Sequence, residues 1–384
     1  MKIIYIAHVP LSSKIKKHWL INDFKKAGID CEYWDVGSIV RKNYCRDSQK
    51  IDNEIILTKI SDFKDHLIKG QQKKTIYLMF FLPDPLSIGL YKVMNIYNCR
   101  TIFFAVGEAP RPKLSVVAKE RIQLKELKVF FKRISYRIYY EVLMLYIKIA
   151  IKPIDLVFYA GSESLRRNLH CKKRVPINLH DNDTYLEAKN CLKPLADGKY
   201  ILFLDGNMTA HPETPPEEYV MDPITYFYKM NRAFARIEDL LGMRVIVAEH
   251  PSSRYEKSIF EDREIYSGST AMLVKDAEMV MGHMSTAISY AVLFEKPLIL
   301  IKTDEMNNFR LATPLLPMIA IVDDLDLEML GAEQIAKMEN FKLPNVNILR
   351  YRQYKYKYLV GAGIEKIKNI NNAMPHVVSL FEQT

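Results

Sequence analysis

Polar side chains that can bind phosphate or move a proton follow three apolar runs in the second half of the chain. The runs span residues 243–248, 277–281 and 297–301, and each is typical of a buried strand. The carboxyl ends of parallel strands meet at one edge of a sheet, where ligands bind. We therefore expect one substrate- and nucleotide-binding site there, built from Gly206, Asn207, His250, Pro251, Ser252, Arg254, Ser285, Thr286 and Glu305.

These residue types suit recognition of an activated phosphate. A histidine at a strand end can donate a hydrogen bond to a departing phosphate as its charge grows. Ser285 and Thr286 precede a helical pattern, so their hydroxyls and nearby N–H groups would face an anion. Arg254 would pair with a phosphate or a sugar carboxylate, and Glu305 would accept ribose hydroxyls.

Each of these residues also has a plainer interpretation. His250 and Pro251 could simply end a strand, and Ser285 could be an ordinary helix N-cap. Arg254 could be a surface charge, and Glu305 a solvated loop carboxylate. Convergence of all four at one sheet edge favours the functional interpretation. His283, beside them, is expected to be a packed histidine rather than a catalyst.

Length and composition bound the class of protein. The chain has 384 residues, enough for two domains, and a net charge of +10, which favours an anionic partner. Five scattered cysteines lack metal-ligand spacing and suggest a reducing compartment. GxGxxG after the first strand, GxxxxGK[ST] and HExxH are all missing, which argues against dinucleotide, P-loop and zinc chemistry. The start reads as a strand rather than a signal peptide, and no membrane span is predicted.

Alternating strand and helix patterns predict an α/β protein with two Rossmann-like domains facing a cleft. A strand, a helix over 14–27 and a second strand fill the first 36 residues. Residues 1–185 form the first domain and 195–384 the second, joined by the polar stretch 176–198. Further strands are expected at 75–81, 101–106, 155–160, 199–204 and, last, 318–322, before a helix at 364–381.

Two loops offer residues for an acceptor. Glu108 lies in a rigid, polar loop after residue 106, although a solvated carboxylate is the plainer interpretation. His211 lies in the proline-rich loop 208–223, whose length is typical of a lid or an acceptor loop.

Segment 113–152 differs from the rest of the chain. It carries ten basic and three acidic residues interleaved with aromatic and aliphatic side chains. Lys and Arg combined with aromatic residues are typical of contact with an anionic membrane surface. A solvated basic face on long domain helices is an equal alternative, and no recognised nucleic-acid module accompanies the segment.

The order Asp205-Gly206-Asn207, His250-Pro251 and Ser285-Thr286 resembles the motifs of bacterial sialyltransferases and Kdo transferases of the GT-B fold. The resemblance implies transfer of an acidic sugar from a CMP-linked donor during capsule or lipopolysaccharide synthesis. It implies that Asp205 is the general base, that His250 contacts the CMP phosphate, and that the Ser/Thr pair holds it. The family usually has two acids before the glycine, whereas Leu204 stands here, so Glu108 and His211 are substitute bases.

We therefore expect a CMP-sugar glycosyltransferase that needs no metal or other cofactor. Its expected partners are a nucleotide sugar, a glycan or glycolipid acceptor and an anionic membrane surface, with no nucleic acid. The expected location is cytoplasmic, on the inner face of the membrane. Alternatives are a UDP-hexose glycosyltransferase, a nucleotide-sugar epimerase of the UDP-N-acetylglucosamine 2-epimerase type, and a membrane-bound scaffold without activity.

Overall fold

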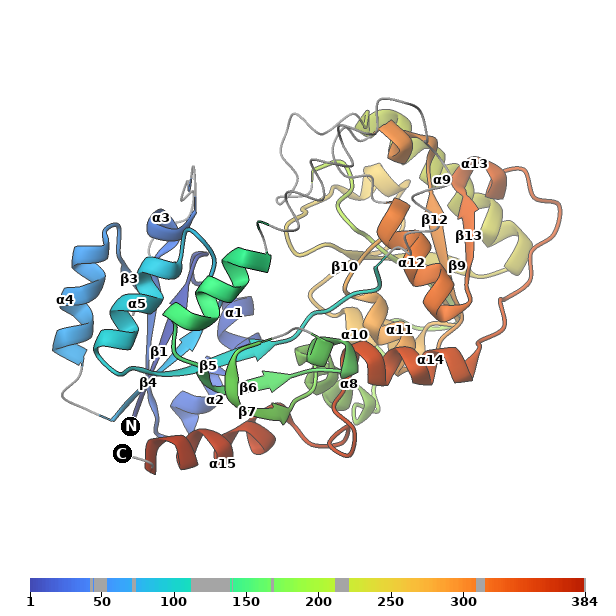
Figure 1. Ribbon diagram of the computed structural model, residues 1–384. Helices are drawn as coiled ribbons and strands as arrows, with labels where there is room; N and C mark the ends of the chain where they lie inside the picture. The colour runs from blue at the N-terminus through green and yellow to red at the C-terminus, as the bar shows by residue number, and fades with distance from the viewer. Residues whose placement is uncertain are drawn as a thin grey trace. The chain divides into compact units, whose positions relative to one another are not determined.

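The computed structural model divides the chain into two α/β units (Figure 1). It describes residues 1–41, 44, 54–70, 74–111, 139, 141–166, 169–210, 221–308 and 315–382. The first unit holds Met1–Glu108 and the described residues of Ile122–His180 and Val360–Thr384. The second holds the described residues of Ala109–Arg121 and Asp181–Leu359.

The first unit is built on a seven-stranded parallel sheet of order β3-β2-β1-β4-β5-β6-β7. Successive side chains of a strand point to opposite faces, and both faces are buried here, which explains the nearly continuous apolar runs. Ile4 and Ile6 of the first strand lie in the core on one face, whereas the hydroxyl of Tyr5 donates to Trp19 O at 3.0 Å. The strands are β1 (Lys2–Ala7), β2 (Asp30–Asp35), β3 (Glu54–Ile56), β4 (Thr75–Met79), β5 (Arg100–Ala105), β6 (Ile154–Tyr159) and β7 (Cys171–Pro176).

Helices cover both faces of this sheet. The predicted helix over 14–27 is two short helices, because Leu20 adopts the left-handed conformation (φ 59°) between them. Gly28 (φ 82°) ends the second, as expected. The helices are α1 (Ser13–His18), α2 (Ile21–Lys26), α3 (Gly37–Val40), α4 (Ile60–Gly70), α5 (Ile88–Ile96) and α15 (Asn369–Glu382), with a 3-10 turn at η1 (Ser162–Arg166).

The C-terminal helix α15 belongs to the first unit, although the sequence grouped it with the second domain. Asn178 and Asn369 hold it there. The Asn178 backbone N–H donates to Asn369 Oδ1 at 3.0 Å, and Asn369 Nδ2 donates to Asn178 O at 2.9 Å. Both residues are buried, so this reciprocal pair fixes where the chain returns.

The second unit is built on a six-stranded parallel sheet of order β10-β9-β8-β11-β12-β13. Gly282 allows β11 to approach β8 closely, because a Cβ there would lie 3.4 Å from Leu204 O. The strands are β8 (Tyr200–Leu204), β9 (Arg244–Glu249), β10 (Ile265–Ser267), β11 (Met279–Gly282), β12 (Leu298–Lys302) and β13 (Glu328–Gly331).

The longest helix of this unit, α9 (Pro223–Leu241), shows how local sequence fixes an element. Asp222 caps it by accepting from Thr225 N at 2.9 Å, Pro223 starts it, and Gly242 (φ 61°) ends it. The other helical elements are α8 (His180–Lys189), α10 (Thr270–Asp276), α11 (Ile288–Leu293), α12 (Leu315–Leu325), α13 (Ala332–Ile335), α14 (Ile348–Tyr354), η3 (Lys257–Phe260), η4 (Asp304–Asn308) and η5 (Lys355–Leu359).

Two sequence predictions need correction. The predicted strand at 318–322 lies inside helix α12, and the last strand is β13, ten residues later at Glu328. A short, wholly apolar run carries no periodicity that separates a buried strand from a buried helix. The connection predicted at 176–198 contains helix α8.

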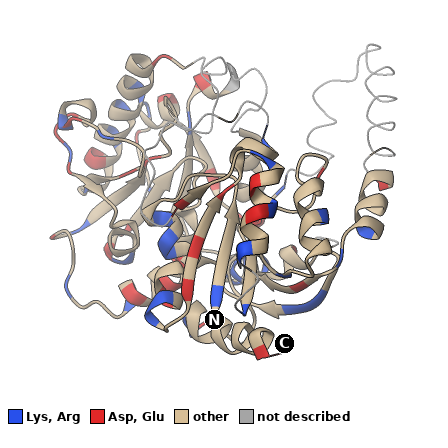
Figure 2. Cartoon of the chain, turned by 90° about the vertical axis from the view of Figure 1, so that its left-hand side faces the viewer, with Lys and Arg blue, Asp and Glu red and all other residues tan. Residues whose placement is uncertain are grey.

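Much of segment 113–152 lies outside the described residues, and residues 141–150 are helical. The described helices include none long and apolar enough to cross a membrane. Basic and acidic residues are interspersed along the described elements in Figure 2.

Candidate functional site

Asp205, directly after β8, joins two loops at the carboxyl edge of the second sheet. Its Oδ1 accepts from Asn207 N at 3.0 Å, and its Oδ2 accepts from His250 N at 3.2 Å. Ser253 Oγ also donates to Oδ2, at 3.3 Å. The side chain is buried, and burial raises the pKa of Asp205 even though these donors act to lower it. Asp205 therefore fixes the loops that follow β8 and β9.

His250 lies at the end of β9 with a defined ring orientation. Its Nδ1 accepts from the backbone N–H of Ser252 at 3.2 Å. Because a neutral imidazole carries its single proton on the other nitrogen, Nε2 is the donor. The ring is partly exposed. His250 is the histidine that the sequence predicts at this strand end. Its Nε2–H group has the right character to donate a hydrogen bond to an anion.

The rest of the loop after β9 has mixed exposure. Pro251, Ser252 and Arg254 are exposed, and the Arg254 side chain has 75% of its surface accessible. Its guanidinium donates to Pro251 O at 3.1 Å and lies 3.9 Å from the buried Glu249 carboxylate. Glu249 also accepts from Tyr255 N at 2.8 Å, which closes the turn. Arg254 is thus tethered at the rim of the loop.

Asn207 and Gly206 are structural within this edge. Asn207 is buried, adopts φ 49°, and donates from Nδ2 to Ala210 O at 2.9 Å. Asparagine tolerates this left-handed conformation better than most residues do. A Cβ on Gly206 would lie 3.6 Å from Met284 O, which brings the loops after β8 and β11 together.

Ser285 and Thr286 follow β11 on its carboxyl side, where the sequence predicts them. Ser285 Oγ accepts from Ala287 N at 3.2 Å, and Ser289 N donates to Thr286 O at 3.1 Å. The helix that follows, α11, has only six residues, so its dipole adds little at this position. The hydroxyls, Ser285 partly exposed and Thr286 exposed, are the groups offered to a ligand.

His283 is a packed histidine, as predicted. It is fully buried, with Nδ1 2.6 Å from Ile301 O and Nε2 2.7 Å from the hydroxyl of Tyr226. Burial lowers the pKa of His283 to about 4, so the ring is neutral at pH 7. The ring donates to the Ile301 carbonyl and accepts from the Tyr226 hydroxyl. Both nitrogens are therefore engaged, and neither is left to transfer a proton.

Glu305 lies after β12 in a cluster with Lys229 of α9 and Glu333 of α13. Both carboxylates form ion pairs with the Lys229 ammonium, and Glu305 is mostly buried. Burial, the largest single effect, raises the pKa of Glu305, but the hydrogen bonds to the carboxylate, that from Lys229 first, and the Lys229 charge together outweigh it, and the net shift is downward. Glu305 Oε2 and Thr303 Oγ1 are buried without a hydrogen-bond partner. Such orphaned atoms suit a ligand hydroxyl.

Lys229 and the buried Ser253 were not selected from the sequence. Lys229 reads there as one charge on the solvated face of an amphipathic helix. Ser253 is adjacent to the selected Ser252, and only burial separates their roles: Ser253 faces Asp205, and Ser252 faces solvent.

The carboxyl edge of the first sheet holds a second group of polar side chains. Glu108, after β5, is 8% exposed, so it is not a solvated loop carboxylate. Asp35, the last residue of β2, accepts from Gly37 N at 2.8 Å, and Glu54, the first residue of β3, accepts from Leu11 N in the loop after β1 at 2.9 Å. These two carboxylates fix loops. His211 lies outside the described residues.

His8 follows β1 at this edge and was read from the sequence only as part of a polar turn. Its Nδ1 is buried without a hydrogen-bond partner, and its ring lies 5.5 Å from that of Phe81. Burial, followed by the charge of Arg41, lowers the pKa of His8 to about 4. The ring is therefore neutral at pH 7.

Among the described residues, no group of histidine, cysteine and carboxylate side chains is placed to hold a metal ion. The described cysteines, Cys31, Cys99, Cys171 and Cys191, form no disulfide with one another.

The sequence matches no protein-family model and no curated protein sequence. Solved structures do share the fold over the whole chain. A variant of the wall teichoic acid polymerase TagF matches with a TM-score of 0.50 and 13% identity, covering 100% of this chain and 89% of that one. A protein from Listeria monocytogenes assigned as a UDP-N-acetylglucosamine 2-epimerase matches with a TM-score of 0.51 and 13% identity, covering 100% and 97%.

Two parallel α/β units and this likeness define a GT-B fold, as the sequence predicted. Neither of the two matched proteins is a sialyltransferase or a Kdo transferase, and membership of those families stays a prediction.

Proposed function

We propose that this protein is a glycosyltransferase that uses a nucleotide sugar bound at the carboxyl edge of its second sheet. The observation that carries the proposal is the Asp205 junction. One buried carboxylate binds the His250 backbone and the Asn207 backbone, and the His250 ring then presents an Nε2–H donor. The fold shared with a polymerase and with a protein assigned as a nucleotide-sugar epimerase supports the proposal.

The phosphates of the donor would contact three groups. His250 Nε2–H donates to a phosphoryl oxygen, and its hydrogen bond strengthens as charge builds on the leaving nucleotide. The hydroxyls of Ser285 and Thr286 donate to the same phosphate region. Arg254, tethered at the rim, neutralises a second phosphate. These donors would act without a metal or another cofactor.

The ribose would bind beside Glu305. Its Oε2 accepts a ribose hydroxyl in place of the partner it lacks within the chain, while Lys229 keeps the carboxylate ionised. Thr303 Oγ1 offers a second hydrogen bond.

We propose a UDP-linked sugar as the donor, ahead of the CMP-linked acidic sugar that the motif order implies. The matched epimerase is named for a UDP sugar, and Arg254 supplies the cation that a second phosphate needs. A CMP-linked nonulosonate or Kdo is retained as the second candidate donor. The order of Asp205, His250 and Ser285 along the chain is the reason to test it beside the UDP sugar.

Asp205 is assigned a positioning role rather than that of the base, because both of its oxygens already accept hydrogen bonds. His8, at the carboxyl edge of the first sheet, is a candidate contact for a glycan or glycolipid acceptor. Its unpartnered Nδ1 would accept a hydrogen bond from an acceptor hydroxyl. Glu108 and His211 are retained on the acceptor side.

An acceptor of surface-polysaccharide type would be found at the inner face of the cytoplasmic membrane. The basic and aromatic composition of segment 113–152 supports contact with an anionic bilayer there.

Nucleotide release separates this proposal from its competitors. Incubation with a UDP sugar and a lipid-linked glycan fraction is expected to release UDP only when acceptor is present. An epimerase, the second candidate because of the matched fold, would convert the sugar without acceptor. Absence of any nucleotide binding would favour the scaffold and reject the transferase.

A further inference from the structure

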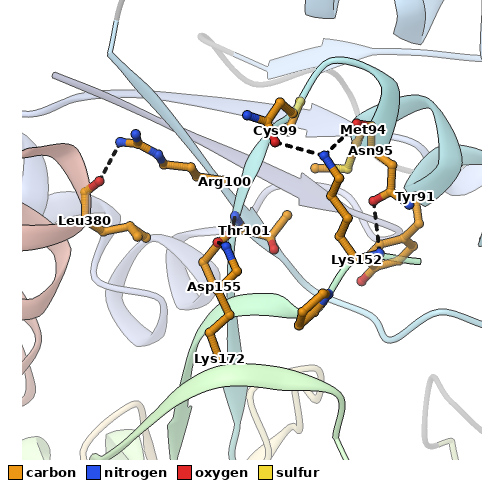
Figure 3. Close-up of a pocket in the computed structure, with 12 residues that line it drawn as sticks. Tyr91, Met94, Asn95, Cys99, Arg100, Thr101, Lys152, Asp155, Lys172 and Leu380 are labelled. Atoms are coloured by element: carbon orange, nitrogen blue, oxygen red, sulfur yellow. Dashed lines mark hydrogen bonds and ion pairs between the residues drawn. The ribbon is translucent and has the colours of Figure 1, made fainter. Parts of the chain in front are cut away.

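A polar cavity of about 230 Å³ lies at the amino edge of the first sheet, opposite the edge that carries His8 (Figure 3). The first residues of β5 and β6 and the loop after α5 line it. Its polar lining includes Asn95, Asn98, Arg100, Lys152, Asp155 and Lys172. The proposed transfer chemistry uses none of these residues.

The cavity is cationic. Lys172 Nζ donates to Asp155 Oδ1 at 2.6 Å, and Thr101 N donates to Asp155 Oδ2 at 2.8 Å, so the one carboxylate of the lining is fully engaged. Lys152 Nζ donates to Asn98 Oδ1 at 2.9 Å, and Arg100 Nη1 donates to Leu380 O at 2.6 Å (Figure 3). The lining therefore carries three cationic side chains and one carboxylate.

The helix over 141–150, green beside α5 in Figure 1, is apolar on both sides. Ile147 is buried in the core, at 5% exposure. On the outer side Val142, Leu145 and Ile149 are 62%, 60% and 78% exposed. Their spacing of three and four residues places them on one face. A helix that is apolar all round ordinarily has an apolar partner on its outer side.

The cavity and this helix form one continuous surface. Lys92 of α5 donates to the hydroxyl of Tyr146 at 2.8 Å, and Asn95 Nδ2 donates to Ala150 O at 3.1 Å. The Lys152 backbone N–H donates to Asn95 Oδ1 at 3.3 Å. Asn95 therefore contacts both the end of the apolar helix and a cation of the cavity.

We propose that this surface docks on an anionic phospholipid membrane, with a headgroup phosphate in the cavity and the exposed helix face in the interfacial region. An anionic phospholipid has a phosphate beside apolar chains, and the surface has cations beside an apolar face. Tyr146, half-exposed on this helix and accepting from Lys92 through its hydroxyl, is a residue type that is typical of a membrane interface. This inference rests on the membrane contact of the proposed function and gives it a headgroup site.

Co-sedimentation of the full chain tests the inference. The vesicles are phosphatidylcholine alone or an equimolar mixture with phosphatidylglycerol. Wild type is expected to bind the mixed vesicles and not the neutral ones. Lys152→Gln with Lys172→Gln is expected to weaken binding about fivefold for each charge removed. Leu145→Glu is expected to weaken it at least about tenfold.

Matched controls exist in the same chain. Lys173→Gln removes the same charge from the next position of β7, whose side chain is beside His376 instead of the cavity. Leu349→Glu changes a leucine of helix α14 with 65% exposure, close to that of Leu145. Both controls are expected to bind the mixed vesicles as wild type does. The variants should keep nearly the wild-type melting temperature, because the Lys172 side chain is 62% exposed and Asp155 keeps its hydrogen bond from Thr101 N.

Three outcomes would overturn the inference. One is equal binding by the cavity variants and wild type; another is equal binding to both vesicle types. The third is saturable binding of inorganic phosphate at the cavity with no binding of mixed vesicles, which would assign the cavity to a free anion. The nucleotide-induced melting shift is measured on the same variants and is expected to be unchanged. Full vesicle binding by the cavity variants with that shift retained would reject this site and leave the transferase proposal standing.

Discussion

The backbone N–H of His250 donates to Asp205 Oδ2 at 3.2 Å, across residues 45 positions apart in the chain. The bond joins the ends of the neighbouring strands β8 and β9. Through this bond the buried Asp205 carboxylate holds the backbone of His250 and so positions its ring.

Asp205→Asn should therefore weaken nucleotide binding. An amide replaces one acceptor oxygen with a donor, so either the Asn207 or the His250 backbone N–H loses its partner, at a cost of about 1–3 kcal/mol in the free energy of unfolding. The dissociation constant of the nucleotide should rise, as measured by titration calorimetry. Asp304→Asn, at an exposed position near the same edge, is the control and should leave both quantities unchanged.

His250→Ala should lower kcat about 100-fold or more, because it removes the donor that stabilises the leaving phosphate. The melting temperature should stay near that of wild type, since the backbone bond to Asp205 remains. His170→Ala, a change of an exposed histidine in the first unit, is the matched control. Near wild-type turnover of the His250 variant would remove this side chain from the mechanism.

Ser285→Ala combined with Thr286→Ala should abolish the melting shift produced by nucleotide. The unliganded protein should lose about 1 kcal/mol, because Ser285 Oγ no longer accepts from Ala287 N. Ser258→Ala, an exposed serine of the same unit, should change neither value. A double variant that still shows the full shift would place the phosphate elsewhere.

Stability should fall in acid partly because of His283. Its pKa is about 4 in the folded protein against an ordinary 6.5, so the unfolded chain binds the proton first as the pH drops. The neutral ring contributes fully above pH 6.5, and about 3 kcal/mol is lost between that pH and 4. Urea titrations across this range should show a smaller loss for His283→Gln. An identical pH dependence in both proteins would contradict the assignment.

The parallel strands and the order of the site loops were predictable from the sequence, because buried strands read as apolar runs that end abruptly in polar residues. Residues 243–248 and 297–301 illustrate this, each within one residue of β9 and β12. Helix α12 (Leu315–Leu325) was missed because residues 315–322 are apolar throughout and carry no helical period; only Asp323 and Asp324 near its end are polar.

Roles within the site depend on tertiary contacts that residue types do not encode. Asp205 resembles a base in the sequence, and only its burial and its three hydrogen bonds support the positioning role proposed for it. Lys229 and Glu305 are 76 residues apart, and their ion pair follows from the packing of α9 against the loop after β12. His8 became a candidate site residue only from the structure, in which its Nδ1 is buried without a hydrogen-bond partner.

The central claim is that the second unit binds a nucleotide sugar, and a melting screen with UDP, CMP and GDP tests it most directly. UDP at about 100 times its dissociation constant should add about 2.7 kcal/mol to the free energy of unfolding of wild type. His250→Ala should reduce that gain, and Ser285→Ala with Thr286→Ala should remove it. A larger shift with CMP would return the donor to the CMP-linked sugars, whereas no shift with any nucleotide would contradict the account.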